Sequence, residues 1–286
     1  MWERPSSATH GSGEPVARLA QRRRIRRRRA LIALCILIGI AASTLIWGLQ
    51  QDSVRISRVD VYGAEASLAD YARGAMQGSY LGIIPRDSIF FFPASKIRTD
   101  IINAYSEIAA VSIFRKGLTG ISMKIDYRVP IARWCGLSPI TFELDVVNGH
   151  GSDEYCYVFD ANGYLYAAAA TTTQTLNNFS LYAPLSEDTL EPLHATLAHA
   201  DELPAAFDFA RQLDTFGSPT VKVVIRGDEA DDYLASGTRI TYVIGHEANA
   251  FTALTSARDT MDLADGSIEY VDLRFDGKVY LKKLPK

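Results

Sequence analysis

Cysteine is scarce in this chain, with three residues in a length of 286. Three are too few for a miniprotein held together by several disulfides or for a four-cysteine zinc module. Glycine (20 residues) and proline (11 residues) are not enriched, which excludes a collagen-like or low-complexity chain. Because 48% of the residues are hydrophobic, the chain can bury a core, and its length suits one or two domains with appendages.

Signatures of catalysis are also missing. The sequence contains no Gly-x-Ser-x-Gly elbow, no Walker loop and no Gly-x-Gly-x-x-Gly turn. Two of the five histidines, His194 and His199, are five positions apart, whereas two metal ligands on one helix face are four apart. We therefore expect solvated histidines, nominate no catalytic residue, metal ligand or cofactor, and predict that the protein is not an enzyme.

One acidic cluster is a candidate for weak cation binding. Asp228, Glu229, Asp231 and Asp232 lie within five consecutive positions. A polar turn between two strands is the favoured interpretation of this cluster. We expect its side chains to be solvated.

Acidic residues are nearly absent from the first 29 positions, where nine Arg face only Glu3 and Glu14 and give a net charge of +7. Because the whole chain has a net charge of -3, the remainder carries -10. A run of Arg can bind nucleic acid, but a strongly acidic body repels a phosphate backbone. We therefore predict no nucleic-acid partner.

Charge is absent altogether from residues 30 to 49, which read ALIALCILIGIAASTLIWGL. Twenty helical residues reach roughly 30 Å, the thickness of the hydrocarbon core of a bilayer. Seven Arg at positions 22 to 29 precede this run. By the positive-inside rule, we predict a basic cytoplasmic tail (1–29), a transmembrane helix (30–50) and an extracytoplasmic remainder. A cleaved signal peptide is the alternative, but its apolar core would be shorter.

Residues 54 to 128 carry the signals of a small α+β module. Residues 54 to 62 alternate as a strand, Ser67 is suited to cap a first helix, and Pro93 to begin a second. Two strand runs joined near Gly117 follow, and helices on one face of such a sheet define an α+β fold. The predicted core consists of Val59, Val61, Leu68, Ile97, Ile101, Val111, Ile113, Met123 and Ile125.

Beyond residue 129 the pattern is again rich in strands. Residues 221 to 245 give two strand runs with a polar turn between them, and residues 246 to 264 are helical. Residues 268 to 282 form a last strand run. Asp160 to Gly163 indicates a hairpin turn, because Asn-Gly tolerates positive φ.

Two of the cysteines, Cys135 and Cys156, lie beyond the apolar run and beside strand candidates. A disulfide between neighbouring strands there would stabilise the folded chain by about 3 kcal/mol. We favour this disulfide, with two buried free thiols as the alternative. Cys35 lies within the apolar run and is interpreted as a small apolar residue.

Several of these stretches resemble one family. The wording V-x-V-x-G, G-x-I-P-R-D-S-I-F-F, I-A-A-V-S-I-F-R and R-V-P-I-A-R-W is similar to the POTRA module of the bacterial cell-division protein family FtsQ/DivIB. The ending I-x-Y-V-D-L-R-F is similar to the β-domain of that family. A basic tail and a single membrane span fit the same family. The resemblance covers about residues 22 to 282 and is weakest at 138 to 200.

The resemblance implies a fold and a function. The fold would be α+β, with a transmembrane helix, a POTRA module (β-α-α-β-β, 54–128) and a mixed β-domain with an antiparallel sheet and helices (129–283). The function would be that of a non-enzymatic divisome scaffold at the division septum of the cytoplasmic (inner) membrane. It would link early septal-ring proteins to the FtsB/FtsL complex and to septal peptidoglycan synthesis. Other divisome proteins would bind through the POTRA module and the transmembrane helix.

A membrane-anchored cell-wall enzyme or sensor with a POTRA-like binding domain is the alternative function. A hydrolase of that kind needs paired carboxylates, a zinc site or an activated nucleophile. No such constellation is legible in the sequence.

The resemblance also implies a binding edge. In the family, the strand after D-L-R-F/Y receives a strand of FtsB. In this chain the corresponding positions are Phe275, Asp276, Gly277, Lys278, Val279, Tyr280, Leu281 and Lys282. Independently of the family, a strand at the end of a sheet offers unpaired backbone groups to a partner strand. Lysines at 278, 282 and 283 suit a protected edge as well as an acidic partner. An ordinary closing strand around Tyr280 is the alternative.

Overall fold

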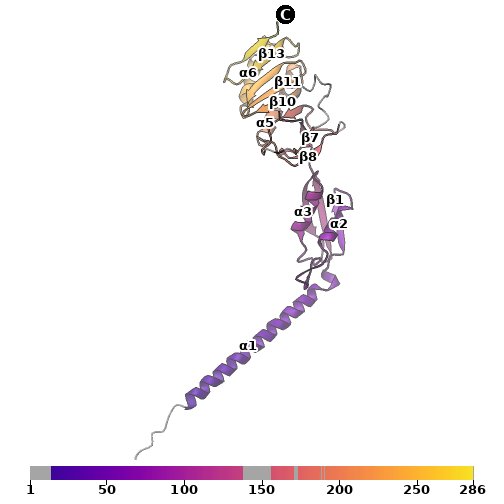
Figure 1. Cartoon of the computed structure of the whole chain (residues 1–286), viewed down its shortest axis with the longest axis vertical. Helices are drawn as coiled ribbons and strands as arrows, with labels where there is room; N and C mark the ends of the chain where they lie inside the picture. The colour runs from indigo at the N-terminus through magenta and orange to yellow at the C-terminus, as the bar shows by residue number, and fades with distance from the viewer. Residues whose placement is uncertain (1–13, 138–155, 171–172, 188, 190, 286) are drawn as a thin grey trace, which may run out of the picture. The chain divides into compact units, whose positions relative to one another are not determined.

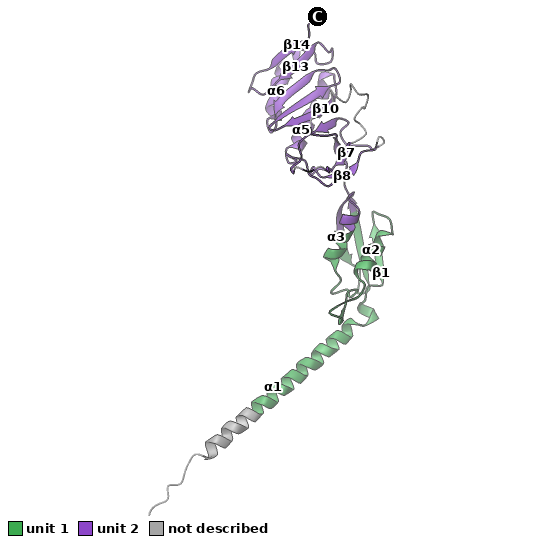
Figure 2. Cartoon of the chain, viewed as in Figure 1, with its two compact units in different colours: residues 1–100, 112–125 green, residues 101–111, 126–286 purple. Residues whose placement is uncertain are grey.

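A computed structural model of the chain has a mixed α+β fold with one long apolar helix and one large sheet (Figure 1). It describes residues 14–137, 156–170, 173–187, 189 and 191–285, with side chains from residue 26 onward. The described chain forms two compact units, the first of residues 1–100 and 112–125 and the second of residues 101–111 and 126–286 (Figure 2). The predicted domain boundary between residues 128 and 129 stays a prediction.

The first element is helix α1 (Glu14–Leu49), which begins within the basic segment. Its stretch Arg26–Leu49 is long and apolar enough to cross a membrane. Its side chains are exposed as far as Leu45, whereas Leu49 at its end is buried. Twenty-four residues of helix span about 36 Å. The part of the predicted tail at residues 1–13 lies outside the described residues, and the orientation of the span stays a prediction.

A three-stranded module follows α1. After a 3-10 helix η1 (Asp52–Val54) come β1 (Arg58–Tyr62), α2 (Leu68–Ala75), the short hairpin β2 (Ser79–Tyr80) and β3 (Ile84–Pro85), α3 (Ala94–Ala104), β4 (Ile108–Arg115) and β5 (Gly120–Tyr127). The strand order is β1-β5-β4, with β1 parallel to β5. The predicted succession of strand, helix, helix, strand and strand is therefore confirmed, with one small hairpin that was not predicted.

Six of the nine predicted core residues of this module are buried, and three are not. Leu68, Ile97, Ile101, Val111, Met123 and Ile125 are buried, whereas Val59, Val61 and Ile113 are only half-buried. The last three lie in β1 and β4, which are the outer strands of the sheet. Ile121 is fully buried and was not predicted, although it alternates with the buried Met123 and Ile125 along the central strand.

The second unit is built on a nine-stranded mixed sheet in the order β14-β13-β12-β11-β10-β9-β6-β7-β8. Its strands are β6 (Ala132–Trp134), β7 (Tyr157–Phe159), β8 (Leu165–Ala168), β9 (Ser180–Tyr182), β10 (Thr220–Arg226), β11 (Glu229–Leu234), β12 (Arg239–Val243), β13 (Ile268–Asp272) and β14 (Tyr280–Lys283). From β6 onward, the described residues form the helical segments α5 (Leu203–Leu213), η3 (Asp214–Phe216), α6 (Glu247–Ser256) and η4 (Arg258–Thr260).

One face of this sheet carries the hydrophobic core. Alternate residues of the strands, such as Val223, Ile240 and Val271, pack with Phe207 of α5 and Leu254 of α6. Each of these helices connects a parallel pair of strands, α5 between β9 and β10 and α6 between β12 and β13. The opposite face of the central strands carries Val224 together with polar side chains such as Asp231 and Thr241.

Three predictions about the second unit are wrong in detail. Residues 221–245 form three strands, because Gly227, with a φ of 58°, and Asp228 make the turn and Glu229 already begins β11. The helix predicted to residue 264 ends at Ser256. The last strand run is folded into the antiparallel hairpin β13–β14, with Gly277 at a φ of 66° in its turn.

The predicted hairpin turn at Asp160 to Gly163 is confirmed, since it joins the antiparallel strands β7 and β8. The Asp160 carboxylate accepts hydrogen bonds from the backbone amides of Asn162 and Tyr164. In a tight turn, where the backbone hydrogen bonds between strands end, such side-chain hydrogen bonds fix the conformation of the backbone.

Candidate partner-binding edge

The β8 edge of the nine-stranded sheet is covered by the chain itself. The amide of Leu165 donates to the carbonyl of Ala195 at 2.9 Å, and the amide of His194 donates to the carbonyl of Leu165 at 2.8 Å. The amide of Leu197 donates to the carbonyl of Gly163. The segment around residues 194–197 therefore occupies backbone groups that would otherwise be open to another strand.

A disulfide between Cys135 and Cys156 closes the strands beside this edge. Trp134 is paired with Tyr157 across the antiparallel strands β6 and β7, so the two cysteines are the next facing pair. The Cα atoms of the two cysteines are 4.3 Å apart, a separation typical of residues that face each other without exchanging hydrogen bonds. Cys35 is the free cysteine of the described chain.

The β14 edge, in contrast, is bare. All four residues of β14 are exposed, and β13 is its only strand neighbour in the described chain. The amide of Leu284 donates inward to the carbonyl of Ser267 at 2.9 Å. Because successive amides of a strand alternate in direction, those of Leu281 and Lys283 point away from β13. These two residues offer their backbone groups to an added strand.

The eight predicted binding residues divide between the edge strand and the turn before it. Tyr280, Leu281 and Lys282 lie in β14, whereas residues 275–279 form the turn from β13. The exposed ring of Phe275 meets that of Tyr280 edge-on, with 5.4 Å between centroids. Val279 is half-buried and packs on the core, so it anchors the turn instead of offering a free side chain.

A groove lies beside this turn, which the sequence did not predict. It has a volume of about 510 Å³. Asn249, Thr252, Ala253, Ser256 and Ala257 of the α6 side line one wall, and Asp276, Gly277 and Val279 line the other. Positions 249, 252 and 256 recur at the spacing of one helix face, and their polar side chains are the signal that could have indicated an exposed helix wall.

Ion pairs hold the turn in place. The Arg274 guanidinium contacts both carboxylate oxygens of Asp272, at 2.9 and 2.7 Å, and Glu229 on β11 at 2.8 Å. The hydrogen bond from Arg274 lowers the pKa of Asp272, and the two carboxylates raise the pKa of Arg274. The turn that leads into β14 is thereby fixed to two strands of the sheet.

The edge has a basic character. Lys282 pairs with Glu269 at 2.7 Å, and this hydrogen bond raises the pKa of Lys282. Within the described chain Lys278 has no ion-pair partner. Open backbone groups suit the binding of an extended segment, and exposed apolar side chains add contact area. The lysines favour acidic residues in such a segment.

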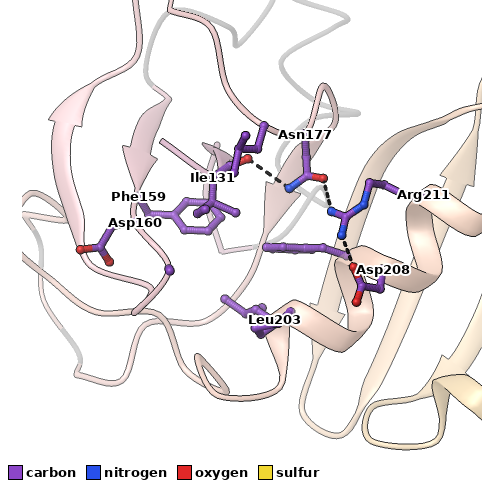
Figure 3. A pocket seen from close by; sticks show the side chains of 11 residues that line it. Ile131, Phe159, Asp160, Asn177, Leu203, Asp208 and Arg211 are labelled. Atoms are coloured by element: carbon purple, nitrogen blue, oxygen red, sulfur yellow. Dashed lines mark hydrogen bonds and ion pairs between the residues drawn. The ribbon is translucent and has the colours of Figure 1, made fainter. Parts of the chain in front are cut away.

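A second concave site lies near the covered edge and is much smaller. Its volume is about 200 Å³, below the usual range for small-molecule sites and closer to the size of one side chain. Figure 3 shows Asn177 between the carbonyl of Ile131, at 3.1 Å, and the guanidinium of Arg211, at 2.6 Å, which also pairs with Asp208. These polar groups are used by one another, so the pocket carries no free pair of acid and base.

Only Asp228 of the acidic cluster lies in the solvated turn that the sequence predicted. Asp231 and Asp232 lie in β11 in the middle of the sheet and point to opposite faces. Asp231 pairs with Arg226 and accepts the hydroxyl of Thr241 at 2.6 Å. Asp232 is completely buried, and no described residue bonds either of its carboxylate oxygens. Burial, with the nearby charge of Asp231, raises its pKa.

The two closely spaced histidines lie apart from any metal-like cluster. His194 is exposed and shares a hydrogen bond of 2.8 Å with the hydroxyl of Tyr164, and His199 contacts Glu202 at 2.9 Å. Within the described residues there is no group of three or more His, Cys, Asp or Glu side chains arranged to hold a metal ion.

The chain matches no model of a known protein family, and no curated protein matches its sequence. The resemblance to FtsQ/DivIB stays a prediction that rests on the short motifs quoted above.

Proposed function

We propose that the protein is a non-enzymatic scaffold of the bacterial division machinery, anchored in the cytoplasmic membrane by α1, and that β14 receives a strand from an FtsB/FtsL-type partner. The observation that carries this proposal is the bare β14 edge, since the opposite edge of the same sheet is covered by the chain. The short motifs supply the family, and the edge supplies the mode of binding.

The basic segment before α1 sets the proposed orientation. Its Arg residues stay in the cytoplasm, and both compact units lie on the other side of the membrane. The three-stranded module takes the part of the POTRA module and, together with α1, binds other divisome proteins at the septum. The nine-stranded sheet takes the part of the β-domain and links the early septal ring to septal peptidoglycan synthesis.

Strand addition supplies affinity and specificity separately. Backbone groups of Leu281 and Lys283 bind the backbone of the incoming strand, whatever its sequence. Exposed side chains of Phe275 and Tyr280 provide apolar contacts, and lysines favour acidic residues on the partner. A partner segment that continues past the turn enters the groove between the turn and α6.

The binding half of the proposal is tested with one proline at each edge. Leu281→Pro removes an amide that points outward from β14 and leaves the β13–β14 ladder intact. Ala168→Pro is the matched control, because the amide of Ala169 donates inward to Cys156, so that of Ala168 points outward from β8. Full-length variants are purified in detergent and tested for binding of the FtsB/FtsL-type complex from the same cell.

We expect Leu281→Pro to weaken binding roughly 100-fold, the scale of an interface hot spot, and Ala168→Pro to leave it unchanged. Circular dichroism should be the same for both variants. Equal binding by the two variants would remove β14 as the docking edge.

The cellular half is tested by a fluorescent fusion in dividing cells. The scaffold should gather at the septum, and Leu281→Pro should still do so, because recruitment is assigned to α1 and the three-stranded module. A uniform membrane signal would contradict the division role while leaving strand addition open to test. Peptidoglycan cleavage by the purified chain would favour the cell-wall enzyme instead.

A further inference from the structure

The chain leaves α1 at Leu49 and is bound to the loops of the three-stranded module a few residues later. The carbonyl of Val54 accepts a hydrogen bond of 3.0 Å from the amide of Ile89. Arg55 holds the carboxylate of Asp87 with Nε and Nη2, at 3.0 and 2.7 Å. From Leu49 to Val54 an extended chain reaches at most about 18 Å. The loop that contains Asp87 and Ile89 therefore stays close to the end of the apolar helix.

Large apolar side chains are exposed on the loops at this same end. Four of them, within eleven positions, form what we call the apolar loop cluster: Leu81, Ile83, Phe90 and Phe91. Their exposed fractions run from 47% to 96%. Single exposed apolar residues are normal on a protein surface, but a group of this size indicates something that covers it.

Leu81 is the least expected member of the cluster. Its backbone has a φ of 51°, in the left-handed region, and its side chain is 96% exposed. A residue with a Cβ is disfavoured in this conformation by about 1 kcal/mol or more, whereas Gly or Asn adopts it readily. Leu81 therefore stabilises neither the turn nor the core. The presence of an apolar side chain at this position calls for a different explanation.

Arginines and aromatic rings surround the cluster. The guanidinium of Arg86 lies 5.2 Å from the ring centroid of Tyr80. Arg115 donates to the carbonyl of Ile89 at 2.8 Å, and its guanidinium lies 5.5 Å from the ring centroid of Phe92. Aromatic rings beside cationic side chains are the composition of the membrane–water interface, where anionic headgroups attract the cations.

We infer that the apolar loop cluster is a membrane-contact surface, which inserts into the headgroup region of the leaflet that α1 leaves. The inference rests on the proposed membrane span. A bilayer is the one apolar surface that the short tether to α1 brings to these loops at all times, whereas a protein partner would have to be recruited. Leu81, at the tip of the β2–β3 hairpin, reaches the acyl chains, and the arginines stay among the headgroups.

The test uses the full chain in vesicles of phosphatidylethanolamine and phosphatidylglycerol, with and without lipids that carry a quencher on the acyl chain. A Cys35→Ser background removes the free thiol. An environment-sensitive fluorophore is attached at Leu81→Cys, or at Tyr62→Cys as the matched exposed control at the far end of β1. A third sample carries the fluorophore on the native Cys35, inside the span.

We expect quenching to reduce the emission at position 81 roughly twofold and to leave that at position 62 nearly unchanged, since an inserted side chain lies within the headgroup and acyl boundary. Adding Ile83→Ser, Phe90→Ser and Phe91→Ser should bring the quenching at position 81 down to the level of position 62.

Two other outcomes overturn the inference and are distinguishable. If Cys35 is quenched while positions 81 and 62 respond alike, the span holds and the cluster does not touch lipid. Protection of position 81 in native membranes alone would then assign the cluster to a protein partner. If Cys35 itself is not quenched, the proposed membrane span fails, and the inference fails with it.

Discussion

The two edges of the nine-stranded sheet are treated in opposite ways. At β8, a returning segment bonds Leu165 and a disulfide joins the strands next to it. At β14, all four residues are exposed, and alternate amides point away from β13. An open edge is a liability that proteins normally cover. The covering of one edge by the chain itself, beside an open edge at β14, supports the proposal that β14 binds a partner strand.

Removal of the disulfide should have the largest effect. Cys135→Ala with Cys156→Ala opens a loop set by a sequence separation of 21, which costs about 3 kcal/mol of unfolding free energy in the chain-entropy estimate. Denaturant titration measures the loss, and hydrogen exchange locates it. Amides of β8 should exchange faster while those of β14 keep their rates. A uniform increase across the sheet would show that the covered edge is not reinforced locally.

The second largest effect is expected from alanine substitutions of the turn glycines at the two edges, which should lower the stability by different amounts. At Gly163, an added Cβ would lie 2.9 Å from the Cβ of Ala200, whereas Gly277 has open space around it. Both have positive φ. Gly163→Ala should therefore cost about 2–3 kcal/mol, from strain and overlap together, and Gly277→Ala about 1 kcal/mol, from strain alone. Equal losses in thermal or denaturant unfolding would contradict the close packing of the covered edge.

A substitution in β11, in the middle of the sheet, should change the stability of the fold without acting on either edge. Asp232 has a raised pKa, so the folded state keeps its proton at a pH where the unfolded state has lost it. Its contribution to stability is full below the unfolded pKa and is lost as the pH rises toward the folded pKa. Asp232→Asn removes this loss and should be more stable than the wild type at pH 7 by about 1–2 kcal/mol.

The same two proteins should be nearly equal in stability at pH 3. Asp231→Asn is the control, because it loses the pairing with Arg226 and should be destabilised at pH 7. A gain from Asp232→Asn that is the same at pH 3 and pH 7 would show that the carboxyl is not held neutral in the fold.

The smallest effect is expected on the open edge itself. Lys282→Ala removes a pair with Glu269 at the protein surface, and pairs of this kind contribute little to the folded state. The free energy of unfolding should stay the same within the error of a denaturant titration. Binding of an acidic partner should weaken and lose part of its salt dependence, as measured by titration at two ionic strengths. A large loss of stability would mean that β14 is held by this pair.

Part of the fold could be predicted from the sequence. Alternation and helical spacing placed the elements of the three-stranded module, and the uncharged run placed the apolar helix. Strand β11 was missed because Asp231 and Asp232 are unfavourable in strands, and only the sheet around them overrides that preference. The turn before β14 was missed although Asp276-Gly277 is a strong hairpin signal.

The covered state of the β8 edge could not be predicted at all. The segment around His194 that bonds Leu165 lies about 30 residues further along the chain and carries no strand pattern. Its pairing depends on where the chain returns in space. The pairing of Cys135 with Cys156 could be favoured, but which strands bring them together required the register of β6 and β7.

On the proposed function, the position of β14 in the chain would give the open edge a role in quality control. β14 follows the other eight strands of its sheet in sequence, and it pairs with β13, which needs the crossover through α6 to lie beside β12. A ribosome therefore makes the docking strand after every strand that supports it. On the proposed topology, a partner meets the edge only on chains that have been exported and have completed their sheet. Truncated or half-folded copies would then be excluded from the proposed division complex without a separate proofreading step.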